Sequence, residues 1–177
     1  MDATTKERKA NLDLWRDEIA KRQADATYTP ETPALIALVE ALGDVRVRDA
    51  LVVDAIPGGA HAADLLLSDP ECDDVGTTVK SMLYESVAPD ERARALSALL
   101  TCVLDADYPL PGTSQAGALA STLAFWAGER ARAAFLSMTT KREGGPGARL
   151  ATLVYLMLSS GMSPGWLSAA EADLTNA

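Results

Sequence analysis

The side chains that could perform acid, base or nucleophilic chemistry are scattered along this 177-residue chain. His61 is the single histidine, so a serine or cysteine nucleophile would depend on it as its base. A lone histidine beside alanine and leucine is more often a surface or capping residue than a metal ligand or a base. We therefore predict no catalytic residue and a protein that is not an enzyme.

A metal site is also not expected. The most acidic run, Ser68–Asp74, fails as a calcium loop starting at Asp69. The sixth position is Asp74 where the turn needs glycine, and the twelfth is Lys80 where a bidentate glutamate belongs. The two cysteines are far apart and lack the spacing of metal ligands, so we expect both to be reduced. These carboxylates are better explained as first-turn residues of a following helix.

The glycine-rich segments do not predict a cofactor. Gly58-Gly59 and residues 144–147 both lack the preceding strand and the following Lys-Ser/Thr of a phosphate-binding loop. We therefore expect no bound cofactor.

Basic residues that could recognise a ligand are concentrated in the C-terminal third. Five cations lie within residues 129–149, against Glu129 and Glu143: Arg130, Arg132, Lys141, Arg142 and Arg149. If the helices around them pair antiparallel, the last three flank one glycine-rich loop that could hold a carboxylate or a phosphate. The alternative is a solvated loop whose cations complement helix ends. We take these five cations, together with Trp15, as candidate partner-binding residues.

The elements that must position these cations are helices. Three successive helices are predicted between Ser114 and Pro164, with stops at Gly128, at residues 144–147 and at Gly161. The first of these helices has many small residues, so a neighbouring helix can approach it closely. These residues are Ala116, Gly117, Ala118, Ala120, Ser121, Ala124 and Ala127. Helical spacing predicts one apolar face on each of the other two: Ala131, Ala134, Phe135 and Met138, then Leu150, Leu153, Val154, Met157 and Leu158.

The N-terminus is predicted to form an amphipathic helix over residues 2–26. Leu12, Trp15 and Ile19 form a narrow apolar stripe, and alternating charges cover the rest of the surface. Two arrangements fit such a helix. It packs along the edge of the domain, or it pairs with another chain through Trp15. We treat residues 1–28 as this helix and residues 29–177 as one all-helical domain.

Further helices are predicted between these two regions. Thr32 is the expected N-cap of a helix that ends at Gly43, and Asp44 is expected to cap the next. The alternation over residues 45–48 would also fit a short strand, but we favour a helix because it does not continue beyond Ala50. Three more helices are expected at about 60–67, 75–86 and 92–105, with a short one after Pro164 that packs Trp166, Leu167 and Ala170.

Residues 114–164 resemble a tetratricopeptide-type unit, a helical repeat of about 34 residues. Gly128 and Ala133 lie at the spacing of that repeat's turn glycine and packing alanine. The positions of the repeat's early Trp and Leu are occupied by Gly117 and Ala120.

Residues 33–167 resemble the C-terminal half of an actinobacterial family, domain of unknown function four-one-nine-two. The resemblance rests on three segments: Asp44 to Leu51, Leu123 to Gly128 with Ala131 and Ala133, and Ala148 to Ala151 continuing to Gly161–Pro164. It implies a helical, tetratricopeptide-like fold and no particular activity.

Charge and composition limit the function classes. The net charge is −9, and residues 31–110 hold 15 acidic against 5 basic side chains. This acidic segment is either solubilising or an electrostatic partner site, and it argues against non-specific DNA binding. No apolar run approaches the roughly 18 residues of a membrane span, and the charged first 25 residues do not resemble a signal peptide. We expect a cytoplasmic, all-α protein: a helical bundle or a short helical-repeat array.

The leading functional hypothesis is a non-catalytic helical interaction module that binds a protein segment or forms homo-oligomers. The alternative is a nucleic-acid-associated regulatory protein that uses the basic loop 130–149. A third reading is a small enzyme with a pair of carboxylates that the sequence pattern does not reveal.

Overall fold

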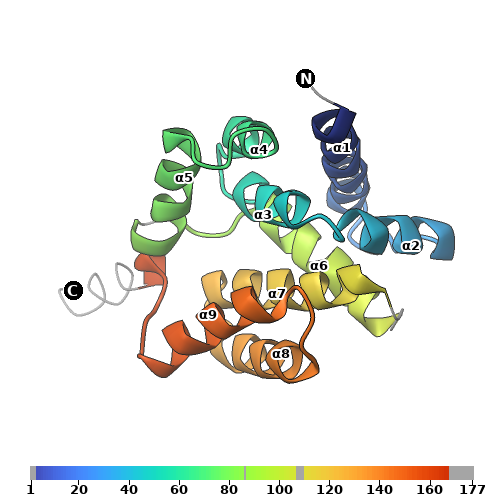
Figure 1. The fold of residues 1–177 in the computed structure, drawn as a ribbon. Helices are drawn as coiled ribbons and strands as arrows, with labels where there is room; N and C mark the ends of the chain where they lie inside the picture. The colour runs from blue at the N-terminus through green and yellow to red at the C-terminus, as the bar shows by residue number, and fades with distance from the viewer. Residues whose placement is uncertain (1–2, 86, 107–109, 168–177) are drawn as a thin grey trace.

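The structure, a computed structural model, describes residues 3–85, 87–106 and 110–167. This part of the chain is helical and contains no β-strand, which confirms the all-α prediction (Figure 1). The helices are α1 (Ala3–Ala24), α2 (Thr32–Ala41), α3 (Val45–Asp54), α4 (Ala60–Leu66), α5 (Asp73–Tyr84), α6 (Glu91–Asp105), α7 (Pro111–Trp126), α8 (Arg130–Glu143) and α9 (Ala148–Ser159). Residues 165–167 are again helical, as expected for Trp166 and Leu167, whereas Ala170 lies outside the described residues.

Helix α7 occupies the centre of the molecule. It packs against α2, α3 and α6 on one side and against α8 and α9 on the other (Figure 1). Every residue from Gln115 to Trp126 is buried. The predicted small residues make this possible: a Cβ atom added to Gly117 would lie 2.4 Å from Oγ1 of Thr140 on α8. The close approach of α8 to α7 therefore depends on the absence of a side chain at this position.

Helix α1 is part of the main core and not a separate unit. It packs on α2, α3 and α6, and its predicted stripe of Leu12, Trp15 and Ile19 is buried. Trp15 is 0% exposed, and its Nε1 donates a hydrogen bond to the carbonyl oxygen of Leu38 at 3.2 Å. The structure thus overturns Trp15 as a partner-binding residue, because a side chain that fills the monomer's own core cannot contact another chain.

The predicted helix starts are mostly correct. The Asp44 carboxylate accepts a hydrogen bond from the backbone N–H of Arg46, so residues 45–48 begin a helix and not a strand. Asp90 caps α6 in the same way, through the N–H groups of Arg92 and Ala93. The cap of α2 was predicted one residue late, since Glu31 and not Thr32 occupies that position.

A network of ion pairs fixes α1 to α3, α4 and α6. Asp54, 2% exposed at the end of α3, accepts hydrogen bonds from Arg16 at 2.7 Å and from Arg92. Lys9 and Arg16 both contact Asp64 of α4 at 2.8 Å. Burial alone would raise the pKa of Asp64, but the hydrogen bond from Lys9 and the charge and hydrogen bond of Arg16 together hold that pKa below its usual value.

Candidate partner-binding site

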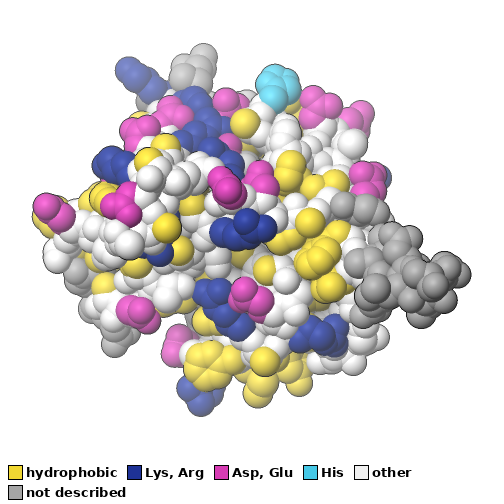
Figure 2. Space-filling model, turned by 180° about the vertical axis from the view of Figure 1, so that it is seen from behind, with side chains coloured by type: hydrophobic (Ala, Val, Ile, Leu, Met, Phe, Trp, Pro, Cys, Tyr) yellow, Lys and Arg dark blue, Asp and Glu magenta, His cyan; other side chains and the backbone are white. Residues whose placement is uncertain are grey.

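Large apolar side chains are exposed mainly on one helical hairpin, α8–α9. Phe135 and Met138 of α8 and Leu153 and Leu156 of α9 are each more than half exposed. Figure 2 shows apolar side chains gathered along the lower edge of the molecule, where α8 runs. Exposed apolar surface of this kind commonly marks an interaction site.

The predicted buried faces of α8 and α9 are therefore partly wrong. Phe135 and Met138 were expected inside, but the face of α8 that meets α7 consists of Ala133, Ser137 and Thr140. The reason is the close packing of the two helices, because an interhelical space lined by alanine and glycine on α7 admits only small residues from α8. The larger side chains consequently lie on the solvent side.

An apolar basin of about 790 Å³ lies between α3, α5 and α9. These three helices surround the same region of the face seen in Figure 1. Most of the lining is aliphatic: Val52, Val53, Leu66, Val75, Val79, Met82, Leu83, Leu150, Leu153, Val154, Leu156 and Met157. Helix α5 packs on α3 and α4, whereas α9 packs on α7 and α8, and this leaves the basin between them.

The sequence contains an indication of this basin. Residues 153–158 of α9 are all apolar, so the helix is apolar on more than the one face that packs on α7 and α8. Val154 is buried in that hairpin, and Leu153 and Leu156 are left on the basin side. Helical periodicity alone assigns all of them to one core and cannot show that the second face lacks a covering element.

The rim of the basin is acidic at the start of α5. Pro70 lines the basin, and Asp69, Glu71, Asp73 and Asp74 around it are exposed. These carboxylates belong to the run that was considered above as a calcium loop. No group of three or more His, Cys, Asp or Glu residues that could hold a metal ion occurs in the part of the chain that the structure describes.

Two further charged residues line the basin but are already engaged. Arg46 donates a hydrogen bond to the carbonyl oxygen of Leu67 at 3.3 Å. Asp49 accepts one from Arg48 Nε at 2.8 Å. Arg46 keeps its positive charge in this bond. Around α5, however, the exposed charges are mainly negative, since Asp69, Glu71, Asp73 and Asp74 stand against Lys80.

The five predicted cations do not form one surface. Arg130 donates hydrogen bonds to the carbonyl oxygens of Leu158 and Met162, so it binds the C-terminal end of α9. Arg132 points elsewhere, to the hydroxyls of Ser97 and Thr101 on α6. Both side chains thus connect helices within the molecule.

Only Lys141 and Arg142 lie together at a hollow, a shallow one of about 530 Å³ that Phe135, Met138 and Tyr155 also line. The ammonium group of Lys141 is 4.8 Å from the centre of the Tyr155 ring, within the range of a cation–π contact. Arg149 is exposed on α9 and does not line this hollow.

Comparison with known proteins gives no assignment: no family model, curated protein or solved structure matches this chain. The resemblance to the actinobacterial family and the tetratricopeptide-like character of residues 114–164 stay predictions. None of the described helices has the length and hydrophobicity needed to cross a membrane.

Proposed function

We propose that this protein is a helical interaction module whose basin between α3, α5 and α9 binds an amphipathic, cationic helix of a partner protein. The observation that supports this most directly is the exposure of Leu153 and Leu156 on the wall of a predominantly aliphatic hollow. Leaving such side chains in water has a free-energy cost that a bound apolar surface would remove.

The dimensions of the basin suit a helix. Helix α9 has 12 residues, which at 1.5 Å per residue makes a wall about 18 Å long. Three turns of a bound helix would span it, with apolar side chains at positions i, i+3 or i+4, and i+7. Met82 and Met157 in the lining are flexible enough to adapt to the shapes of those side chains.

The charge of the rim indicates the charge of the partner. Asp69, Glu71, Asp73 and Asp74 would repel an acidic helix and attract a basic one. Because these side chains are exposed, their effect is expected mainly on the association rate and to weaken with added salt.

The two alternatives find less support. A nucleic-acid site over residues 130–149 would need its cations on one surface, but Arg130 and Arg132 are bonded within the fold. A hydrolase with two carboxylates would need both to face one hollow. Asp54 and Asp90 do line one hollow, of about 320 Å³, but Asp54 is bonded to Arg16 and Arg92, and Asp90 caps α6.

Site-directed photo-crosslinking tests the proposal. A benzophenone amino acid at position 153 of the full chain is irradiated in the cells that produce the protein, and the cross-linked partner segment is mapped by mass spectrometry. A synthetic peptide of that segment is then titrated by fluorescence anisotropy. We expect a helical, net-positive segment whose Kd rises at least about tenfold for Leu153→Glu.

Val45→Ser is the matched control, since Val45 is also an exposed apolar residue but does not line the basin. Its peptide affinity should stay within about twofold of wild type. An acidic or non-helical mapped segment, or equal affinity for Leu153→Glu, would contradict the proposal.

A second copy of the chain is the other possible occupant. Helix α8 presents Phe135, Met138, Lys141 and Arg142 on its surface, so it is itself a basic, apolar helix. A cross-link from position 153 to α8 of another molecule, with a mass in light scattering that rises with concentration, would replace the partner by self-assembly and overturn the proposal as stated.

A further inference from the structure

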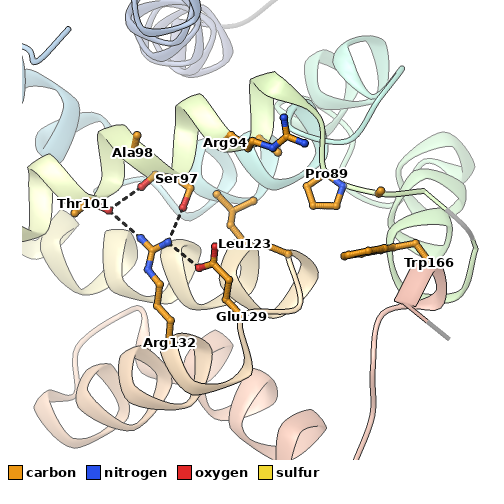
Figure 3. A pocket seen from close by; sticks show the side chains of 12 residues that line it. Pro89, Arg94, Ser97, Ala98, Thr101, Leu123, Glu129, Arg132 and Trp166 are labelled. Atoms are coloured by element: carbon orange, nitrogen blue, oxygen red, sulfur yellow. Dashed lines mark hydrogen bonds and ion pairs between the residues drawn. The ribbon is translucent and has the colours of Figure 1, made fainter. Parts of the chain in front are cut away.

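A second hollow, of about 470 Å³, lies where α6, the end of α7 and the start of α8 meet. Among the residues that the structure describes, none lines both this hollow and the basin. Its floor is formed by small or aliphatic residues: Ala93, Ala98, Leu123 and Ala127. Figure 3 shows Pro89 and Trp166 on one side of it and the polar residues of α6 and α8 on the other.

Trp166 forms a fixed aromatic wall of this hollow. Its Nε1 donates a hydrogen bond to the carbonyl oxygen of Trp126 at 2.7 Å. The indole ring points into the hollow toward Leu123 (Figure 3). Because the polar end of the ring is already bonded, the remaining surface that it offers is flat and apolar.

The two arginines of the hollow differ in their bonding. Arg132 donates hydrogen bonds to Ser97 and Thr101, and its Nη1 lies 2.9 Å from a carboxylate oxygen of Glu129. Arg94 is exposed, and its guanidinium group makes no hydrogen bond or ion pair with any residue that the structure describes. The hollow therefore contains one guanidinium group that is paired with a carboxylate, that of Arg132, and one that has no bonding partner among the described residues, that of Arg94.

We propose that this hollow binds a carboxylate carried on a flat apolar body. Two N–H groups of Arg94 would hold the carboxylate in the bidentate geometry that guanidinium and carboxylate groups share. The body of the ligand would rest on Leu123 and against the Trp166 ring. Glu129 disfavours a doubly charged phosphate, because it reduces the net positive charge of the site to one.

Such a carboxylate has two sources: a free small acid, or the C-terminal residue of a peptide with an aromatic side chain. The volume of the hollow is within the range of sites for either. The chemistry of recognition is the same in both cases.

Fluorine NMR of the full chain labelled with 5-fluorotryptophan tests this site. Of the three tryptophans, Trp15 and Trp126 are 0% and 1% exposed, and only Trp166 faces the hollow. The Trp166→Phe variant assigns its resonance. The probes are 3-phenylpropionate and the peptide N-acetyl-Ala-Ala-Phe with a free carboxylate, each compared with its uncharged amide.

We expect a saturable shift of the Trp166 resonance with at least one of the two acids. Arg94→Gln should raise the Kd at least about tenfold, and Arg94→Lys should raise it less, because a charge remains but the bidentate geometry is lost. Arg142→Gln, which removes an exposed cation outside the hollow, should leave the Kd unchanged. Binding of both acids indicates a site for free acids, and binding of the peptide alone indicates a site for C-termini.

Three results would overturn the inference. They are equal shifts with acid and amide, an unchanged Kd in Arg94→Gln, and the absence of a saturable shift with either acid up to about 10 mM. Because Arg94 is exposed and unbonded, loss of folding is not a concern for its variants, and their tryptophan spectra verify this.

Discussion

At the scale of single residues, Asp54 shows how a charge can be essential inside an apolar segment. In the sequence it stands among Leu51, Val52, Val53 and Ile56, and helical periodicity says nothing about its partners. The structure shows that both carboxylate oxygens are used, one by Arg16 and the other by Arg92. These residues are 38 positions away on either side, so the pairing depends on tertiary structure and could not be predicted from sequence.

We predict that Asp54→Asn lowers the free energy of unfolding by about 3 kcal/mol. The substitution keeps the shape but removes the charge that compensates two arginines, and breaking a buried pair from one side is costly. Urea unfolding at pH 7 followed by circular dichroism measures the change. Asp13→Asn is the control: this carboxylate also contacts Arg16, but it is half exposed, so its loss should cost about 0.5 kcal/mol or less.

At the scale of helices, the sequence predicts existence and order well and the orientation of faces less well. All the predicted helices between Ala3 and Ser159 are present, and the glycine at position 128 has a positive φ angle at the turn between α7 and α8. The face of α8 was misassigned because a period of 3.6 residues identifies Phe135 and Met138 as apolar neighbours without identifying which side the next helix occupies. Gly117 and Thr140 determine that side, because their contact allows α7 and α8 to pack closely.

We predict that Gly117→Ala destabilises the protein by about 1–3 kcal/mol, although alanine is the better helix former. The new methyl group would lie 2.4 Å from Oγ1 of Thr140 and push α8 away from α7. Thermal and urea unfolding of Gly117→Ala, Thr140→Ala and the double variant form a thermodynamic cycle. The second substitution should restore part of the loss, and a fully additive pair would contradict this explanation.

At the scale of the whole molecule, the sequence did not determine whether the N-terminal helix belongs to the domain. A narrow apolar stripe on a highly charged N-terminal helix is compatible with packing inside the domain or against another chain. In the structure the helix packs inside the domain, since Leu12, Trp15 and Ile19 belong to the main core. Arg16 also bonds the same helix to Asp54. The basin was missed for a related reason: sequence periodicity cannot show where three distant helices leave a space.

We predict that Trp15→Ala costs about 3–5 kcal/mol of folding free energy, because it empties a fully buried site and removes one of the two donors to the Leu38 carbonyl, which keeps the backbone N–H of Leu42. Affinity for the peptide mapped at position 153 should be unchanged where the variant is folded. Urea unfolding measures the loss of stability. Because α1 belongs to the main core, the circular dichroism signal of all the helices should be lost in one transition. A stability within about 1 kcal/mol of wild type would contradict the role of Trp15 in the core.

The second, smaller cluster of buried side chains has a consequence for how the molecule opens. Ala124, Phe125, Ala133 and Val154 join α8 and α9 to α7, apart from the main core that the earlier helices share. Local opening in proteins follows such units, so amide protons of this hairpin should exchange with solvent before those of α3 or α6. Its release would uncover the alanine-lined side of α7 and give a protease access to the glycine-rich loop at residues 144–147. The rate at which a cell degrades this protein would then be set by one pair of helices, while the rest of the chain stays folded.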